Sequence, residues 1–336
     1  MDSNAHYSIV TPVYNEAEGL ETLYSRLSIA AITWGRPYEV IVVNDGSTDD
    51  THKILLNISK RDSKWKIVNL SRNFGHQMAI SAGLSYASGE VIAVMDSDLQ
   101  DPPEVLPEFF EKLENADVVY AIRKNRKEGF IKRLCYSLFY RLLKSIASID
   151  IPLDSGDFCV MNRRVLNRLN SLPERQRFVR GLRAWLGFKQ IGHEYERASR
   201  DFGQPKYNLR KLAALAIDGL LSFSHFPLRI LSFVGLALCG LAISSAAFVT
   251  AWWVFEFKIG SMSPHQVLGW TSLMITILFL SGLQFLFMGI IGEYVGTIFQ
   301  EVKNRPSWVV ESTTGIQVAH EIHNSQTTSA KKISLA

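Results

Sequence analysis

Acidic side chains follow a short apolar run in the segment AVMDSDLQDPPE, residues 93–104. Asp96 and Asp98 are separated by one residue, and residues i and i+2 of a strand project from the same side. Two carboxylates at one spot repel each other unless one is protonated, water separates them, or a cation bridges them. Oxygen ligands of this kind are typical of Mg²⁺ or Mn²⁺ sites that keep positions open for phosphate oxygens. The alternative is an exposed acidic turn in which Asp101 caps a following helix.

Four β-branched runs precede such polar residues: YSIVTPVYN, YEVIVVND, WKIVNLSRN and EVIAVMDSD. Segments with helical periodicity separate them, at residues 16–34, 49–62 and 75–88. This alternation predicts an α/β fold with a Rossmann-like, mostly parallel sheet and helices on both faces. A fifth run, DVVYAIR, continues the pattern. Because ligands bind beyond the carboxyl ends of parallel strands, we predict a site at that rim.

Two later stretches contain no charged residue, at 230–255 and 267–292. Each has about 26 residues, more than the ~20 needed to cross a bilayer, so two transmembrane helices are predicted. Basic residues precede the first stretch and follow the second, which places both chain ends in the cytoplasm. The N-terminus lacks the features of a signal peptide. The prediction is therefore a multi-pass protein of the inner (plasma) membrane with a cytoplasmic catalytic domain.

The same patterns divide the chain into four parts. They are a catalytic domain at 1–206, a juxtamembrane helix at 207–227, the two spans at 228–293, and a cytoplasmic tail at 294–336. The tail is expected to be disordered after about Ser312. Basic and apolar residues interleave at 130–149, which predicts either an amphipathic helix at the membrane interface or a surface helix packed on the domain.

Several motifs together resemble glycosyltransferase family 2, whose members are inverting transferases with a GT-A fold. They are TPVYNE (11–16), VNDGSTD (43–49), NFGHQMA (73–79), DSDLQDPPE (96–104), AIR (121–123), DSGDF (154–158) and RDFGQPKY (200–207). A P-loop and a dinucleotide-binding glycine motif are both missing. Within the family the chain is similar to polyprenyl-phosphate glycosyltransferases, including dolichyl-phosphate mannose synthases and bacterial bactoprenol sugar transferases. Two predicted spans favour the bacterial branch.

The resemblance implies a role for each matching residue. Nucleotide-sugar contacts fall on Pro12, Tyr14, Glu16, Asp45, Asn73, Asp96 and Arg200. The metal ligands are Asp96, Asp98 and Gln100, and the acceptor-phosphate contacts are Arg123, Lys132, Arg133 and Lys206. Asp98 acts in catalysis through the metal, while Asp157 orients the acceptor or serves as its base, with orientation favoured.

The sequence departs from the family pattern at two points. Pro205 replaces the Ser that commonly precedes the lysine, and Tyr136 and Ser137 leave the register of the basic helix open. Two lone histidines, His76 and His193, are interpreted as structural. The basic segment LPERQRFVRGLRAWLG is expected to form a helix that folds over the site as a lid.

The expected reaction is transfer of a sugar, with glucose favoured, from a UDP-sugar to undecaprenyl phosphate, giving a lipid-linked monosaccharide. The expected partners are these two substrates and the lipid bilayer, with no nucleic acid. The resemblance implies a homo-oligomer, with a tetramer as one form considered, and small residues such as those of GLALCGLAISSA permit close helix contacts. Two alternatives stay open: a glycolipid or polysaccharide synthase of the same fold, and a non-catalytic membrane scaffold.

Overall fold

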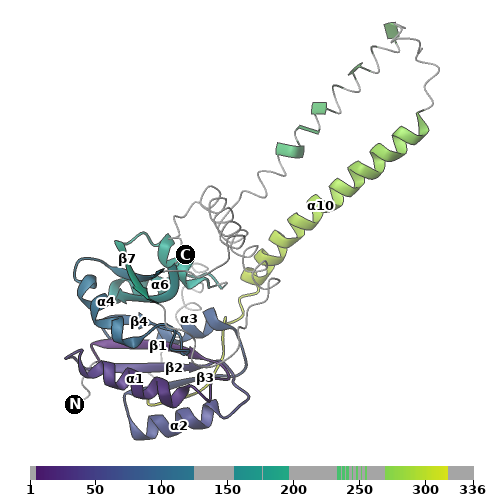
Figure 1. The fold of residues 1–336 in the computed structure, drawn as a ribbon. Helices are drawn as coiled ribbons and strands as arrows, with labels where there is room; N and C mark the ends of the chain where they lie inside the picture. The colour runs from purple at the N-terminus through teal and green to yellow at the C-terminus, as the bar shows by residue number, and fades with distance from the viewer. Residues whose placement is uncertain are drawn as a thin grey trace, which may run out of the picture. The chain divides into compact units, whose positions relative to one another are not determined.

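A computed structural model of the chain describes residues 5–124, 155–175, 177–196 and 269–316, with scattered positions between 233 and 255. The chain forms two compact units, which are described separately. The first is an α/β domain around one eight-stranded sheet, in the order β7-β5-β6-β4-β1-β2-β3-β8 (Figure 1). Its strands are β1 (Tyr7–Val13), β2 (Tyr38–Asn44), β3 (Trp65–Leu70), β4 (Val91–Val94), β5 (Val118–Lys124), β6 (Ser155–Asn162), β7 (Gln190–Glu196) and β8 (Val310–Thr314).

The sheet is mixed, with four parallel and three antiparallel strand pairs. Strands β1 to β4 pair in parallel, as the sequence predicted, and β5 pairs in parallel with β7. However, β6 lies between β4 and β5 and runs antiparallel to both. The fifth apolar run therefore continues the strand direction without lying next to the fourth. Because β6 runs the opposite way, its first residues lie at the same rim as the carboxyl ends of β1 to β4.

Helices cover both faces of this sheet, as expected. The hydrophobic core on one face takes side chains from α1 (Leu20–Ile32), α2 (Thr51–Arg61) and α4 (Leu106–Leu113). The helices α3 (His76–Tyr86), α6 (Arg163–Ser171) and α7 (Val179–Trp185) contact one another on the other face. On that face α3 packs so closely that a Cβ on Gly83 would lie 2.4 Å from a methyl carbon of Val10. A 3₁₀ turn, η1 (Pro103–Val105), leads into α4.

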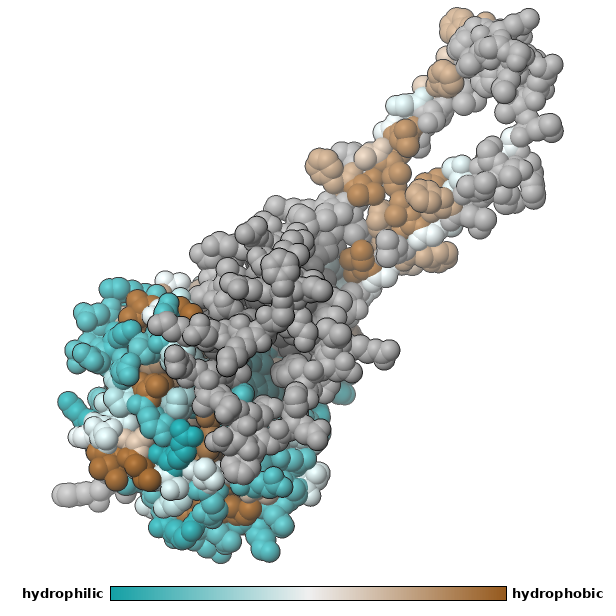
Figure 2. Space-filling view, viewed as in Figure 1, coloured by the Kyte–Doolittle hydropathy of each residue, from teal (hydrophilic) through white to brown (hydrophobic). Residues whose placement is uncertain are grey.

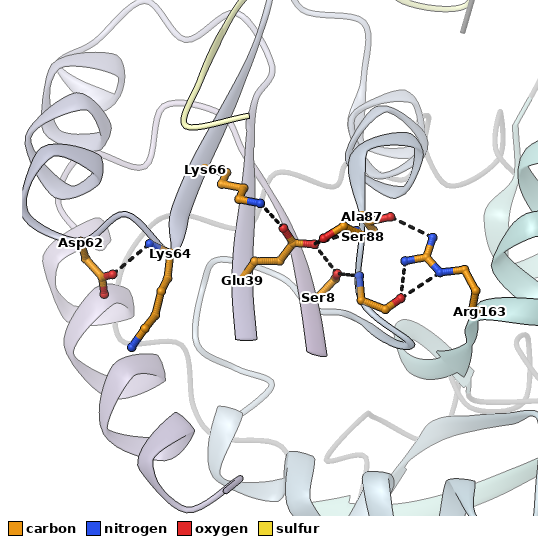
Figure 3. Close-up of polar contacts among 9 residues, drawn as sticks. Ser8, Glu39, Asp62, Lys64, Lys66, Ala87, Ser88 and Arg163 are labelled. Atoms are coloured by element: carbon orange, nitrogen blue, oxygen red, sulfur yellow. Dashed lines mark hydrogen bonds and ion pairs between the residues drawn. The ribbon is translucent and has the colours of Figure 1, made fainter. Parts of the chain in front are cut away.

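A buried carboxylate ties together the amino-terminal ends of the strands (Figure 3). Glu39, at the start of β2, accepts hydrogen bonds from the Ser8 hydroxyl at 2.5 Å and from both the backbone and the hydroxyl of Ser88. Lys66 of β3 donates to its other oxygen at 2.5 Å. Burial alone would raise the pKa of Glu39, but the hydrogen bonds from Lys66, Ser8 and Ser88 outweigh it and lower that pKa below the ordinary 4.5.

Replacing Glu39 with Gln is expected to destabilise the domain by about 1–3 kcal/mol at pH 7, since one amide cannot satisfy donors on three sides. A carboxyl whose pKa is lowered by folding stabilises the fold above its ordinary value, and this contribution is lost as the pH falls through the lowered pKa. The difference in melting temperature between wild type and Glu39→Gln should therefore narrow below pH 4.5. Glu21→Gln is the control, because Glu21 pairs with Arg61 on the exposed surface and should leave the melting temperature unchanged. An equal Glu39→Gln difference at pH 7 and pH 4 would contradict the assignment.

The last described strand corrects the boundary expected for the C-terminal tail. Val310–Thr314 forms β8, which pairs antiparallel with β3 at the edge of the sheet. The side chain of Asn69 donates a hydrogen bond to the Ser312 hydroxyl at 3.0 Å. Ser312 to Thr314 were expected to be disordered, and they are ordered because pairing with β3 satisfies the backbone groups on one side of the segment. This segment therefore belongs to the α/β domain.

The second unit contains the long helix α10 (Trp270–Val302), on which the described large apolar side chains, such as Phe279 and Phe285, are exposed (Figure 2). In the described part of the chain, Phe279–Phe299 is the helix that is long and apolar enough to cross a membrane. It overlaps the second predicted span and continues past Glu293, beyond the predicted end at 292. The first predicted span falls mostly outside the described residues, as do the amphipathic segments 130–149 and 207–227.

Candidate functional site

The carboxyl end of β1 marks the point where the sheet topology switches. β1 pairs with β2 as far as Val13, whereas its pairing with β4 ends at Val10. Pro12 has no backbone N–H, and Val10, two residues earlier, is the residue that bonds towards β4. The missing donor of Pro12 therefore costs no ladder bond, because β4 has already ended there. Ligands of α/β sheets bind at such switch points.

The loops after β1 and β2 are locked to each other. Asn15 has a positive φ of 52°, which asparagine tolerates better than most residues. Its backbone N–H donates to the Ser47 hydroxyl at 3.0 Å, and its side-chain oxygen accepts from the backbone of Thr48 at 2.8 Å. The N–H of Glu16 donates to the Thr51 hydroxyl at 3.0 Å. These bonds fix the backbone at Asn15 and Glu16, directly after Tyr14. Tyr14 and Glu16 are two of the predicted nucleotide-sugar contacts.

Asp45, a predicted nucleotide-sugar contact, holds a third loop in place. Its carboxylate accepts the backbone N–H of Phe74 at 2.7 Å and that of Gly75 at 2.9 Å. The residue is 3 % exposed, and burial is the main cause that raises its pKa. Each carboxylate oxygen has a further lone pair, so these bonds leave acceptor capacity for a ligand. Asn73, another predicted contact, belongs to the loop that Asp45 holds.

Gly46 is required by the close approach of that loop. Its φ is +67°, and a Cβ would lie 2.4 Å from the carbonyl carbon of Arg72 and 2.6 Å from the nitrogen of Asn73. Gly46→Ala should displace residues 72–75, break the Asp45 hydrogen bonds, and weaken nucleotide binding by at least about tenfold, the loss expected when a binding group moves by about an ångström.

Gly35→Ala is a matched control for this substitution. Gly35 has nearly the same φ, +65°, but a Cβ added there would meet no heavy atom within 4 Å. Both variants carry the backbone strain, so only Gly46→Ala should lose UDP binding in isothermal titration calorimetry. Equal UDP affinity in the two variants would show that the 72–75 loop does not form part of the nucleotide site.

The acidic segment lies in a turn, which corrects the expected geometry. β4 ends at Val94, so Asp96 and Asp98 are not strand neighbours that project from one side. The Asp98 carboxylate instead accepts the backbone N–H of Gln100 at 3.2 Å, and the buried Leu99 between them has a φ of 57°. Asp101 is not the expected helix cap: it is 1 % exposed and accepts a hydrogen bond from the Tyr195 hydroxyl.

Negative charge is concentrated around Asp96. Burial is the main cause that raises the pKa of Asp96 to about 6, and the charges of Asp101, Asp157 and Asp98 add to it while His76 opposes it. In the described part of the chain, no three His, Cys, Asp or Glu side chains form a metal site by themselves. Mg²⁺ is commonly held by one or two carboxylates together with substrate phosphates, and the carboxylates and amide of this turn fit that mode.

The Asp157 carboxylate lies at the same rim as Asp96. It belongs to β6 and is delivered there because β6 runs antiparallel to β4. His76, the first residue of α3, places its Nε2 3.3 Å from Asp157 Oδ2 and 3.5 Å from Asp96 Oδ1. The ring therefore lies between the predicted metal ligand and the predicted catalytic residue, which the structural interpretation of this histidine missed.

Opposite charges shift the pKa values of this pair. Burial alone would lower the pKa of His76, but the hydrogen bond to Asp157 and the charges of Asp96, Asp157 and Asp45 outweigh it and raise that pKa to about 9. Burial would likewise raise the pKa of Asp157, but His76 and the charge of Arg180 lower it to about 2. At neutral pH the pair is a cationic imidazole facing a carboxylate.

Two further residues of this region went unrecognised in the sequence. Gln77 donates to Asp157, and Arg180 of α7 acts on the same carboxylate. The signal for Gln77 was the place of NFGHQMA at the carboxyl end of a predicted strand, where the helix start faces the rim, whereas Arg180 belongs to the basic segment predicted to fold over the site. His193 is buried between Lys112 and Glu108, away from this rim, in keeping with a structural role.

The predicted acceptor contacts lie largely beyond what the structure describes. The backbone of Arg123 is part of β5 and pairs in register with Tyr195. The remaining three acceptor contacts, Lys132, Arg133 and Lys206, fall outside the described residues, as does Arg200, a predicted nucleotide-sugar contact.

Comparisons with known proteins agree with this fold. The sequence profile of Glycosyl transferase family 2 matches residues 8–169. The uncharacterized glycosyltransferase YkcC of Bacillus subtilis (strain 168) is 44 % identical over 319 residues, which cover 94 % of this chain and 97 % of the relative. The SfII prophage-derived bactoprenol glucosyl transferase of Shigella flexneri is 38 % identical, with 91 % of this chain and 97 % of the relative covered.

Solved structures give a weaker similarity. A glucosyl-3-phosphoglycerate synthase from Mycobacterium tuberculosis, crystallised with Mn²⁺, UDP-glucose and phosphoglyceric acid, has a TM-score of 0.47 and 21 % identity. The match covers 65 % of this chain and 79 % of that chain. A similarity of this size carries no conclusion about ligands.

The mixed α/β sheet with acidic residues at its switch point is that of a glycosyl-transferring enzyme. The chain belongs to glycosyltransferase family 2, and its relatives over nearly the whole length include bactoprenol glucosyl transferases.

Proposed function

We propose that the chain transfers a single glucosyl residue from UDP-glucose to undecaprenyl phosphate, with inversion, at the cytoplasmic face of the inner membrane. The observation that carries the proposal is 38 % identity to bactoprenol glucosyl transferases across 91 % of the chain, including the helical C-terminal part. The site geometry supports it, because the α/β domain supplies a charged rim and α10 supplies an apolar helix.

The nucleotide half of the site is assigned to the loops that the structure locks together. Pro12, Tyr14 and Glu16 border the switch point, and Asp45 and Asn73 lie across from them at the ends of β2 and β3. The hydrogen bonds between these loops fix them before substrate arrives, so that binding a nucleotide costs little ordering.

A divalent cation, Mg²⁺ or Mn²⁺, would be held by Asp96, Asp98 and the amide oxygen of Gln100. When bound, it supplies charge that stabilises the departing nucleoside diphosphate. The three carboxylates near Asp96 favour a cation there electrostatically. His76 contributes a fixed positive charge between Asp96 and Asp157.

The acceptor phosphate is anionic at neutral pH, so the chain has to position it rather than deprotonate it. Asp157 is assigned to that task, with Arg123, Lys132, Arg133 and Lys206 as the proposed cationic contacts. Two spans, with both ends in the cytoplasm, would hold this site beside the lipid headgroups. A homo-oligomer remains a prediction.

The test is reconstitution of the purified full chain in detergent with UDP-glucose, Mg²⁺ and undecaprenyl phosphate. Mass spectrometry should detect a lipid carrying one hexose, with one UDP released per lipid. Parallel reactions with UDP-galactose and UDP-N-acetylglucosamine identify the donor.

Three results would count against the proposal. Chains of several sugars on the lipid indicate a polysaccharide synthase, and transfer to a non-phosphorylated lipid indicates a glycolipid synthase. UDP binding without UDP release indicates a non-catalytic scaffold.

A further inference from the structure

Gln77, in the first turn of α3, joins two elements through its carboxamide. Its Nε2 donates a hydrogen bond to Asp157 Oδ2 at 2.8 Å. Its Oε1 accepts the backbone N–H of Val179 at 2.9 Å. One side chain thus connects the predicted catalytic carboxylate on β6 to the first residue of α7.

The chemistry of Asp157 and of the Val179 N–H explains why an amide side chain fits at position 77. An ionised carboxylate only accepts hydrogen bonds, and a backbone N–H only donates. An amide offers one group of each kind, so its orientation follows from its neighbours. A carboxylate at position 77 could still accept from Val179, but it would face Asp157 as a like charge.

The bond to Val179 also completes the start of α7. The first N–H groups of a helix have no partner inside the helix. Phe178 precedes α7 and supplies no side-chain cap, so Gln77 supplies a partner from another helix. α7 carries Arg180, whose charge lowers the pKa of Asp157. The position of this charge and the position of the carboxylate therefore depend on the same amide.

The two oxygens of Asp157 are used unequally. Oδ2 accepts from Gln77 and faces His76 Nε2 at 3.3 Å. Oδ1 is buried and has no hydrogen-bond partner among the residues that the structure describes. We propose that Gln77 is a positioning residue, which holds Oδ2 and the start of α7 so that Oδ1 is left to face the reacting groups. This inference rests on the proposed transferase function.

Two substitutions at this position separate the bonds. Gln77→Glu keeps an acceptor for Val179 and removes the donor to Asp157, whereas Gln77→Met removes both. With the full chain in detergent, kcat should fall roughly 10- to 100-fold in each, the range expected for a misplaced reacting group. KM for UDP-glucose should stay within about twofold, because the Gln77 carboxamide bonds to Asp157 and Val179 rather than to a proposed nucleotide residue.

Gln190→Glu is the matched control. Gln190, at the start of β7, donates from Nε2 to the Arg183 carbonyl at 2.8 Å, so it bonds to the other end of α7. The same chemical change there disturbs α7 without touching Asp157. Its kcat should remain within about twofold of wild type.

A double-mutant cycle tests the bridge without any turnover. Melting temperatures are compared for Gln77→Met, Asp157→Asn and the double variant. Directly bonded residues give non-additive effects. A second double variant, Gln77→Glu with Asp157→Asn, restores an amide–carboxylate pair in which the amide is at position 157 and the carboxylate at position 77. Its melting temperature should return towards that of the wild type, whereas its kcat should stay low.

The outcomes are distinguishable. A wild-type chain that forms no lipid-linked hexose defeats the proposed function, whatever the cycle shows. A wild-type chain that does so, combined with a Gln77→Glu kcat equal to that of Gln190→Glu, overturns the positioning role. Additive melting temperatures in the cycle would overturn the bridge itself.

Discussion

Replacing Asp98 with Ala is expected to abolish glucosyl transfer, with kcat lowered by roughly 100- to 1,000-fold or more, the range seen when a group that stabilises developing charge is lost. Asp98 and Asp96 are the acidic residues of the turn after β4, and the charge of Asp98 already raises the pKa of Asp96. Removing Asp98 takes away one of two carboxylates that would hold the cation, so the diphosphate would leave without compensation for its charge.

A readout that does not depend on turnover identifies the metal role. UDP affinity should increase when Mn²⁺ is added to the wild-type chain, and this increase should be missing in Asp98→Ala. Asp98→Glu should need a higher Mn²⁺ concentration for half-maximal rate, because it keeps the charge but shifts the oxygens. Asp62→Asn is the control, since the Asp62 side chain accepts the backbone N–H of Lys64 in the turn before β3, at the opposite end of the strands from the rim. Full activity of Asp98→Ala would rule out the assignment.

The parts of the fold that depend on local pattern were predictable. The strands β1 to β4 fall inside the four apolar runs, and α1, α2 and α3 fall inside the three segments of helical periodicity. Burial on both faces makes a parallel strand continuously apolar, which leaves a clear signal in the sequence. The rim of polar residues followed from the same rule, because the carboxyl ends of parallel strands meet at one edge.

The parts of the fold that depend on pairing between segments distant in the sequence were not predictable. β6 enters between β4 and β5 although it follows β5 by some thirty residues, and β8 joins β3 through a contact between Asn69 and Ser312, 243 residues apart. No local periodicity records either pairing. The turn at Asp96 was also not predicted, because nothing in the sequence indicates that β4 ends at Val94 rather than two residues later.

His76 illustrates the same limit within the site. Its partners Asp96 and Asp157 are 20 and 81 residues away in the sequence, and only the mixed sheet brings them to one histidine. A single histidine at a helix start was therefore interpreted as structural. Once the direction of β6 is known, a charged side chain at the start of α3 has to face the carboxylates.

Asp157→Asn is expected to lower kcat by about 100-fold or more, through loss of position and charge rather than loss of a base. A carboxyl with a pKa of about 2 is a weak base at neutral pH, because base strength falls with pKa. The acceptor phosphate needs no base, since its second ionisation near pH 6 already makes it a nucleophile. The acidic limb of the pH–rate profile should therefore lie near pH 6 in both the wild type and Asp157→Asn.

Asp117→Asn is the control that separates a loss of kcat from a loss of stability. Asp117 accepts hydrogen bonds from Asn162, Arg164 and the Lys189 backbone, at the end of the sheet opposite the rim. Its replacement should lower the melting temperature while kcat is kept, the reverse of the result for Asp157→Asn. If the acidic limb disappears in Asp157→Asn, Asp157 is a general base after all, and its pKa in the substrate complex must lie far above 2. If the limb persists with a lowered kcat, the carboxylate acts by holding the acceptor in line with the sugar.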